Sequence, residues 1–243
     1  LTISAMSATG VTSIDASKSS ADVTVNAGAN AGNELTYTGG TGADDLRLTA
    51  EFDGLDTLSG GAGTSDELRI TLAANDTAVG ALDANSAAVV TGFESIDLRV
   101  TAGGAATTIG TDMDFFSGAT SIDLGALDTS ATTTFTLTDL SATQAGDIDV
   151  TLGANANAGV AVVADMKVNG TDTVDLDVTT TADGQDVTLN DANDNIENAN
   201  IALSGTFNTA LDVDATSFLT SLTVSGGAAD HTLTTGTAFA NAT

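Results

Sequence analysis

The chain has no cysteine, no proline and no tryptophan, and it is poor in basic residues. Without cysteine it forms no disulfide and offers neither a zinc-thiolate site nor a thiol nucleophile. Only five residues are lysine or arginine, against 33 acidic ones, so the formal net charge is −28. Nucleic acid is therefore a poor partner, because duplex binding requires clustered cations. An anionic membrane surface is disfavoured for the same reason.

The motifs of common enzymes are also missing. His231 is the only histidine, and there is neither a G-x-S-x-G nucleophile elbow nor a phosphate-binding G-x-x-x-x-G-K. Acidic residues are frequent enough to supply a glycosidase pair, but eight phenylalanines and one tyrosine are few for a sugar-binding groove. We expect no active site in this chain and no enzymatic activity.

Apolar runs are short, and none approaches the roughly 18 residues that a membrane helix needs. The sequence starts at Leu1 without a cleavable signal peptide, and we expect it to belong to a longer polypeptide. Threonine, valine, asparagine, aspartate and glycine dominate, and these residues are poor in helix interiors. Instead, short runs alternate apolar and polar residues between clusters of Gly, Ala, Asn and Asp, which predicts an all-β fold.

A repeated phrase gives the architecture. Ser-Ile-Asp-Leu and close variants recur, and their apolar anchors Ile96, Ile122, Ile148 and Val174 follow one another at steps of 26 residues. Ile70 lies the same distance before Ile96, and Ile201 and Leu222 continue the series at steps of 27 and 21. A constant step over this length is typical of stacked repeats.

The prediction is therefore a β-solenoid, similar to a parallel β-helix, with about 26 residues and two short strands per coil. A β-sandwich with a strand every 8–12 residues is the alternative, but it gives no reason for the same phrase at a constant step. We expect two sections, residues 1–68 with glycine-rich turns and residues 69–243 as the solenoid body, continuous with each other.

Stacking in register would place Asp97, Asp123, Asp149 and Asp175 in one column, about 4.8 Å apart. Two interpretations stay open for this column. It is either a solvated outer face that keeps the solenoid soluble, or a set of carboxylates that binds divalent cations inside a subunit or at a subunit contact. Ala202 and Thr223 interrupt the column in the last coils.

Glycine-rich turns mark the first section. Residues 39–46 (GGTGADDL) fit the nonapeptide pattern G-G-x-G-x-D-x-U-x, in which U is a large apolar residue. Residues 60–68 are a looser copy with one extra residue before the aspartate, and residues 54–58 read as half a motif. Glycine permits turns that aim carbonyl oxygens inward, and aspartate adds a hard anionic ligand suited to Ca²⁺. The turns thus predict calcium, although simple hairpin turns are the alternative; Asp230, after Gly226 and Gly227, is a further candidate ligand.

These glycine-rich motifs resemble the RTX repeats of proteins exported by type I secretion. The phrase at residues 89–98 (VVTGFESIDL) is similar to the rungs of RTX-type bacterial surface-layer proteins, and large RTX adhesins share it. The resemblance implies a calcium-stabilised β-solenoid that assembles into a two-dimensional lattice on the bacterial cell surface. It also implies a homo-oligomer anchored to a cell-surface glycan or lipopolysaccharide through another region. By this resemblance the calcium ligands include Asp44, Asp45, Asp56 and Asp66, with backbone oxygens near Gly39 and Thr41.

Two functional classes follow. The first is a self-assembling structural protein of an extracellular surface layer. The second is a stalk or ligand-binding segment of a secreted RTX adhesin. The coils vary in sequence and no separate ligand-binding domain stands out, which favours the lattice protein.

Overall fold

The computed structural model describes most of the chain, and all structural statements below concern its described residues. These are residues 1–3, 10–28, 34–49, 52, 55–73, 89–102, 107–127, 132–153, 159–168, 172–191, 196–205, 209–214, 219–226 and 230–235.

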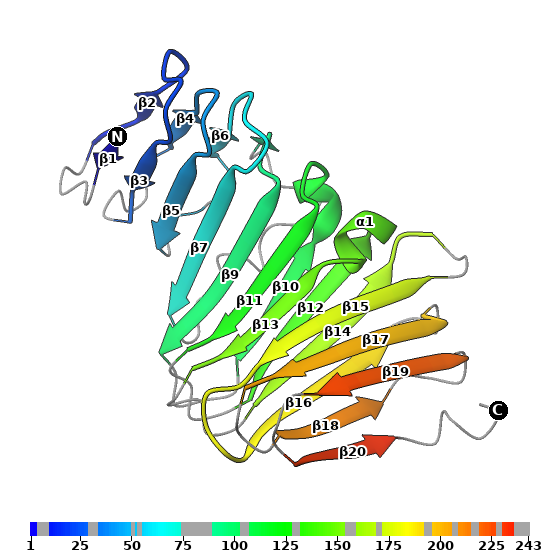
Figure 1. The fold of residues 1–243 in the computed structure, drawn as a ribbon. Coiled ribbons are helices and arrows are strands. Elements are labelled where there is room, and N and C mark those ends of the chain that lie inside the picture. The colour runs from blue at the N-terminus through cyan, green and yellow to red at the C-terminus, as the bar shows by residue number, and fades with distance from the viewer. Residues whose placement is uncertain are drawn as a thin grey trace.

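The described chain winds into a parallel β-solenoid, as predicted, and every strand pairing is parallel. Figure 1 shows the strands stacked in chain order from the blue N-terminal end to the red C-terminal end. One ten-stranded sheet, here called the main sheet, runs along the whole stack. Its strands are β1 (Thr2–Ile3), β3 (Thr24–Asn26), β5 (Asp45–Thr49), β7 (Glu67–Ala73), β9 (Ser95–Ala102), β11 (Ser121–Ala126), β13 (Ile148–Leu152), β15 (Thr173–Thr179), β17 (Asn198–Ser204) and β19 (Ser221–Gly226).

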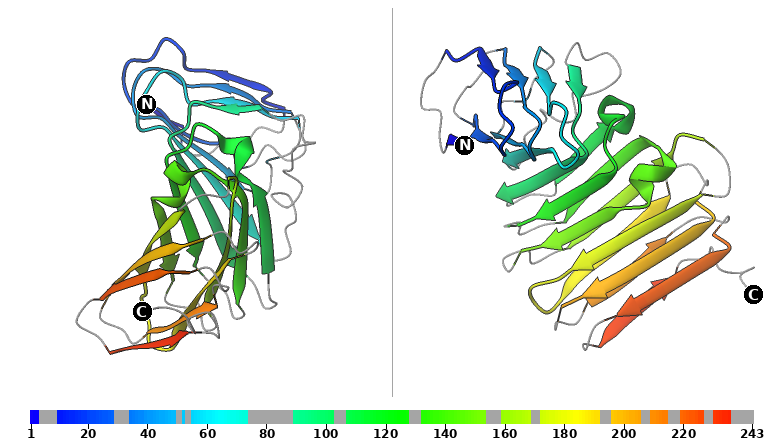
Figure 2. Two further views of the ribbon diagram at one scale, coloured as in Figure 1. Left: turned by 90° about the vertical axis from the view of Figure 1, so that its right-hand side faces the viewer. Right: turned by 45° about the horizontal axis from the view of Figure 1, so that its top comes forward.

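The opposite side of the solenoid is made by two shorter sheets, which Figure 2 shows facing the main sheet. The four-stranded N-terminal side sheet contains β2 (Ser13–Asp15), β4 (Thr36–Thr38), β6 (Thr57–Ser59) and β8 (Val89–Thr91). The six-stranded C-terminal side sheet contains β10 (Thr107–Asp112), β12 (Thr133–Leu140), β14 (Val160–Met166), β16 (Gln185–Asp191), β18 (Thr209–Asp214) and β20 (His231–Thr235). Each coil therefore contributes two strands, which confirms that prediction and excludes the β-sandwich.

The core lies between these sheets because alternate residues of each strand point inward. Ile96, Ile122 and Ile148 form one inward column, and each is at most 1% exposed. Burial of such a side chain stabilises the fold by about 1.5–3 kcal/mol. The repeated apolar anchors of the sequence are thus the inner surface of the main sheet.

The register agrees with the 26-residue step only in the middle of the solenoid. Ile96, Ile122 and Ile148 pair as predicted, but Ile148 then pairs with Leu176 rather than with Val174. The coil between β13 and β15 is therefore two residues longer than the repeat. A shift of two keeps the same face of a strand inward, so Val174 is still fully buried. Parity is preserved while the partner changes.

The same error of two residues occurs at both ends. Ile70 pairs with Leu98, whereas Leu68 pairs with Ile96. Farther on, Ile201 pairs with Val224 rather than with Leu222. The predicted anchors all point inward, fully or in part. Outside the central coils, however, the predicted strand partners of these anchors are wrong, because loop length varies between coils.

The N-terminal coils are shorter than the others. Thr24 pairs with Asp45, and Asp45 with Glu67, at steps of 21 and 22 residues. The main sheet continues without a break through β7, where the boundary between the two expected sections falls. The opposite side changes from one side sheet to the other between β8 and β10. The division after residue 68 stays a prediction.

In the described ranges, helix is confined to two single turns at one corner, η2 (Met113–Phe116) and α1 (Ala142–Ala145). Ser141 and Gln144 form a reciprocal capping box at the start of α1. The Gln144 side-chain amide also donates to the carbonyls of Met113 and Phe116 at 3.2 and 3.0 Å, which ties α1 to η2 in the coil before it. In the part of the chain that the structure describes, no helix is long and apolar enough to cross a membrane.

Candidate functional site

The aspartates predicted to bind calcium lie inside the N-terminal coils. Asp44 and Asp56 are 1% exposed and Asp66 is fully buried. Asp44 and Asp66 immediately precede β5 and β7 of the main sheet, whereas Asp56 precedes β6 of the N-terminal side sheet. The structure therefore brings Asp44 and Asp66 together at one corner of the solenoid and places Asp56 at another.

These carboxylates accept hydrogen bonds from backbone amides of the preceding coil. The amide of Val23 donates to Asp44 Oδ1 at 2.9 Å, and the amide of Asp44 donates to Asp66 Oδ1 at 2.7 Å. The amide of Asp66 in turn donates to Glu94 Oε2 at 2.9 Å. We call Asp44, Asp66 and Glu94 the corner ladder. It satisfies amides that the turns would otherwise leave unpaired in the interior.

Asp56 repeats this arrangement at the other corner, where its Oδ1 accepts from the amide of Leu35 at 2.8 Å. Sequence reasoning recognised the aspartates but not this role, because the bond joins residues 21 positions apart. The recurrence of aspartate just before a strand was the available signal.

Glycines allow the turns to stack closely enough for the ladder to form. A Cβ on Gly39 would lie 1.9 Å from the Gly60 carbonyl oxygen and 2.6 Å from Asp44 Oδ2. A Cβ on Gly60 would lie 1.9 Å from the Gly92 carbonyl oxygen. Real Cβ atoms do not approach backbone atoms so closely, so Gly39 and Gly60 are required by the close stacking of the coils. Gly92, the next glycine of this column, has a φ of 66°, and the turn conformation explains it instead.

Two buried oxygens beside the corner ladder have no hydrogen-bond partner among the described residues, Asp66 Oδ2 and the Tyr37 hydroxyl. Burial raises the pKa of Asp66, and the negative charges of Glu94 and Asp44 raise it further, although the backbone amides of Asp44 and Gly63 oppose the rise. Burial also raises the pKa of Tyr37, with added contributions from Asp44, Asp66 and Asp45. A buried carboxylate oxygen without a hydrogen-bond partner destabilises the fold. A cation bound at Asp66 would offset this cost.

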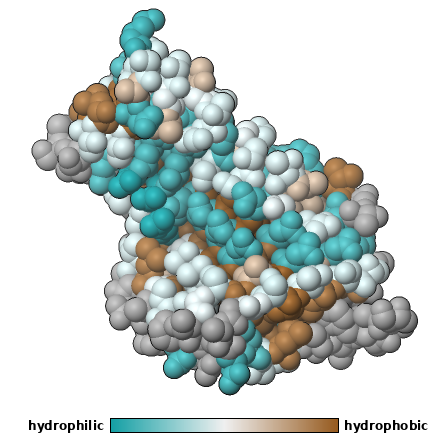
Figure 3. Space-filling view, in the orientation of Figure 1, coloured by the Kyte–Doolittle hydropathy of each residue, from teal (hydrophilic) through white to brown (hydrophobic). Residues whose placement is uncertain are grey.

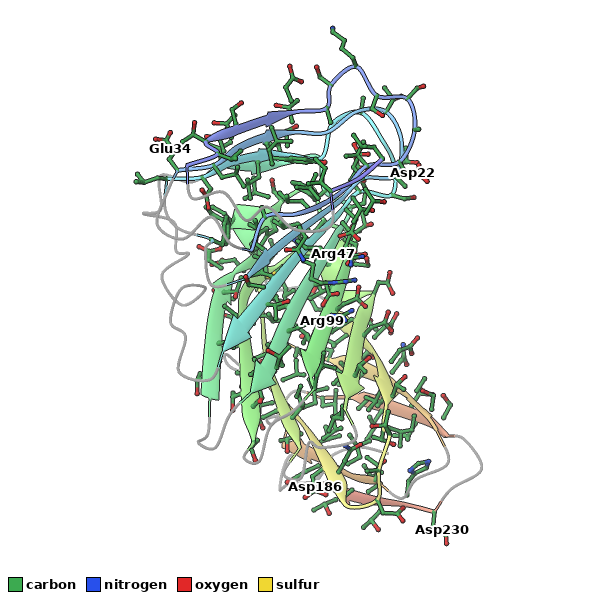
Figure 4. The ribbon with its side chains drawn as sticks, turned by 90° about the vertical axis from the view of Figure 1, so that its left-hand side faces the viewer. Asp22, Glu34, Arg47, Arg99, Asp186 and Asp230 are labelled. Carbon is green, nitrogen blue, oxygen red and sulfur yellow. The ribbon has the colours of Figure 1, made fainter. Side chains whose placement is uncertain are left out.

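The other predicted ligands have different surroundings. Asp45 forms an ion pair with Arg47 on the outer face, and its Oδ1 has no hydrogen-bond partner within the described part of the chain. The amides of Gly39 and Thr41 donate to carbonyls of neighbouring coils at 2.8 and 3.0 Å. Asp230 is exposed and lies at the opposite end of the solenoid (Figure 4). Within the described ranges, no three acidic, histidine or cysteine side chains gather as a metal-binding group.

The second candidate is the line of charged residues on the outside of the main sheet, here called the outer column. Arg47, Arg69, Asp97, Asp123, Asp149 and Asp177 occupy it in successive strands. The prediction that Asp175 is the fourth aspartate of the column is therefore wrong, because the two-residue shift puts Asp177 at that position. Asp175 pairs instead with Asn200 in the adjacent column.

Arginines neutralise one part of the outer column. Asp97 Oδ2 lies 2.7 Å from Arg69 Nε and 2.6 Å from an Arg99 terminal nitrogen, and Asp97 is 1% exposed. Arg69 also contacts Glu67 at 2.6 Å. Figure 4 shows Arg47 and Arg99 on the same face of the sheet, and Figure 3 shows hydrophilic side chains along this face. Three of the five basic residues thus gather on one acidic surface.

Comparison with family models, with curated proteins and with solved structures gives no match. The interpretation of these two regions therefore rests on their geometry and on the sequence motifs.

Proposed function

We propose that this chain is the structural body of a secreted surface-layer protein that assembles with copies of itself on a bacterial cell and is stabilised by calcium. The observation that carries the proposal is the unbroken main sheet, in which ten parallel strands repeat the same inward and outward columns. Such a stack is an elongated scaffold whose neighbouring coils support one another. A scaffold with a regular face suits a lattice subunit.

Four residues of the surface-layer rung phrase have a structural role. Phe93 is buried and stacks on Tyr37, with ring centroids 6.4 Å apart. Glu94 accepts the amide of Asp66 in the corner ladder. Ile96 is in the core, and Asp97 is held by arginines. The phrase therefore joins the short N-terminal coils to the longer coils that follow, which supports its use as a rung.

For calcium, the support comes from Asp66. Its Oδ2 is buried without a hydrogen-bond partner in the described residues, and the charges of Glu94 and Asp44 act on it. The turn at Gly63 is adjacent, since a Cβ there would lie 2.7 Å from both Asp66 carboxylate oxygens and 2.3 Å from the Gly42 carbonyl oxygen. Ca²⁺ takes six to eight oxygen ligands, including backbone carbonyls. Asp66 with turn carbonyls fits such an ion better than Asp44, whose two oxygens already accept amides.

Assembly is tested with the purified chain in millimolar calcium and in a chelator, by sedimentation velocity and negative-stain electron microscopy. The proposal predicts sheets or filaments with calcium and dispersed protein without it. A chain that stays monomeric in both solutions contradicts the lattice. If that monomer binds cell-surface glycans, the stalk or ligand-binding segment of an adhesin becomes the better description.

Calcium binding is tested separately by thermal unfolding of the parent, Asp66→Asn and Asp186→Asn. Calcium bound only to the folded chain stabilises it by about 2.7 kcal/mol at a concentration 100 times Kd. We expect the parent and Asp186→Asn to melt at higher temperature with calcium, and Asp66→Asn to lose this response. Asp186 is an exposed residue on the C-terminal side sheet, so it controls for the lost charge. An equal response in all three proteins excludes Asp66 as a ligand.

A further inference from the structure

The outer column changes character halfway along the solenoid. From β5 to β9, the carboxylates of the outer face each form an ion pair with an arginine; they are Asp45, Glu67 and Asp97. Beyond Asp97, the column continues as Asp123, Asp149 and Asp177, paired directly with one another across β11, β13 and β15. The next strand, β17, contributes Ala202, which carries no charge. Three aspartates therefore stack without an interposed cation among the described residues.

The groups facing these aspartates are mostly acidic. Asp123 lies between Asp97 and Asp149, with Arg99 of β9 as the one attractive charge acting on it, and Ser95 Oγ lies 3.3 Å from its Oδ2. Asp149 is affected by Asp147, which precedes its own strand, and by Asp177 of β15.

Asp175 precedes Asp177 by two residues on the same strand, so both side chains lie on the same face. One oxygen of Asp175 accepts the Asn200 side-chain amide at 2.7 Å. Among the described residues, the three stacked carboxylates thus have only carboxylates, neutral groups and one already paired arginine around them.

The energetic consequence follows from the strand spacing. Neighbouring strands are about 4.8 Å apart, and two like charges at that distance repel by about 1 kcal/mol even in water. Asp149 has such a neighbour on each side. Burial, followed by the charges of Asp97 and Asp149, raises the pKa of Asp123. Asp149 is exposed, but partial loss of its hydration, followed by the charges of Asp147 and Asp177, raises its pKa, although a hydrogen bond with Asp123 opposes the rise.

We propose that Asp123 and Asp149, stacked next to the charge of Asp177, take up protons as a coupled pair, which makes the C-terminal coils more stable in mildly acidic than in neutral solution. A proton shared between adjacent carboxyls replaces repulsion with a hydrogen bond along the column. A carboxyl whose pKa is raised by folding contributes stability that is present below its unfolded pKa, near 4. That contribution is lost as pH rises through the folded pKa. The inference does not depend on calcium or on lattice assembly.

The test compares thermal unfolding of the parent, Asp149→Asn and Asp186→Asn between pH 4 and pH 7.5, in chelator and at low salt. Asparagine copies the shape of the neutral carboxyl. We expect Asp149→Asn to raise Tm at pH 7.5 by about 3 °C and to give no gain at pH 4. Asp186→Asn removes the same charge from an exposed site on the other side and should shift Tm by about 1 °C or less at both pH values.

A second measurement reads the protons directly, by NMR titration of the aspartate side-chain carboxyl carbons. Asp123 and Asp149 should titrate at higher pH than the aspartates of the unfolded chain, with broadened or two-step curves, and the Asp123 curve should change in Asp149→Asn. The proposal is wrong if these curves are simple and match those of the unfolded chain. It is also wrong if Asp149→Asn and Asp186→Asn shift Tm equally at pH 7.5.

Discussion

The N-terminal and C-terminal coils have the same parallel architecture but handle their acidic residues differently. In the short N-terminal coils, Asp44 and Asp66 are buried and bonded to backbone amides, and the outer carboxylates meet arginines. In the longer C-terminal coils, the outer aspartates stack on one another. A chain of net charge −28 thus places compensated carboxylates in one region and uncompensated ones in the other.

The difference teaches that coil length and charge arrangement vary together. Steps of 21 and 22 residues require glycine turns that stack backbone on backbone, and buried aspartates fill the corners. Steps of 26 residues leave room for corner turns such as η2 and α1, which the Gln144 side chain joins. The hydrophobic core runs through both regions, and the aspartates bonded to amides between coils are an addition in the N-terminal turns.

The largest effect is expected when an inward column of the C-terminal coils receives a charge. Ile148→Asp would bury an unpaired carboxylate between Ile122 and Leu176, and it should destabilise the fold by about 4 kcal/mol or more. Chemical denaturation followed by circular dichroism measures this. Thr151→Asp, at an exposed position of the same strand, is the control and should change little. Equal unfolding of both variants would mean that the inward and outward faces are misassigned.

A smaller but still large effect is expected at the glycine column of the N-terminal coils. Gly60→Ala places a Cβ against the Gly92 carbonyl oxygen, and such overpacking costs about 3 kcal/mol. Gly110→Ala is the matched control, because a Cβ there meets nothing within 4 Å. Urea midpoints of the two variants give the comparison. A Gly60→Ala protein as stable as Gly110→Ala would show that the turns do not stack this closely.

A moderate effect is expected where the two regions meet on the outer column. Asp97→Asn removes the buried charge that holds Arg69 and Arg99, and it should cost about 2 kcal/mol. Asp114→Asn breaks the half-exposed ion pair with Lys167 and should cost at most about 0.5 kcal/mol. Denaturant unfolding at low and high salt measures both. If the two losses are equal, Asp97 is no more important than a surface ion pair.

Much of this fold followed from the sequence, since alternation fixed the inward faces and the 26-residue step indicated stacking. The partner of each strand could not be predicted at every coil, because loops absorb two extra residues without changing which face is buried. This is why Val174 is correctly predicted to point inward, although Ile148 pairs with Leu176 rather than with Val174.

The candidate site was predictable in its residues but not in its bonds. Asp44, Asp56 and Asp66 stood out by their glycine turns, yet their amide partners belong to other coils and have no local signal. The ion pair between Arg69 and Asp97 could not be predicted either, because it depends on the strand register that pairs these two residues.

Disulfide trapping tests the central claim most directly, namely that the outer column passes from Asp149 to Asp177. The chain has no cysteine of its own, so paired substitutions give a clear result. Asp149→Cys with Asp177→Cys places the two thiols on directly paired residues, within the Cα separation that a disulfide allows. Asp149→Cys with Asp175→Cys separates the two Cα atoms by more than about 7 Å. After mild oxidation, mass spectrometry should find a disulfide in the first protein and free thiols in the second. A disulfide in the second protein alone would contradict the register, and with it the stacked aspartates.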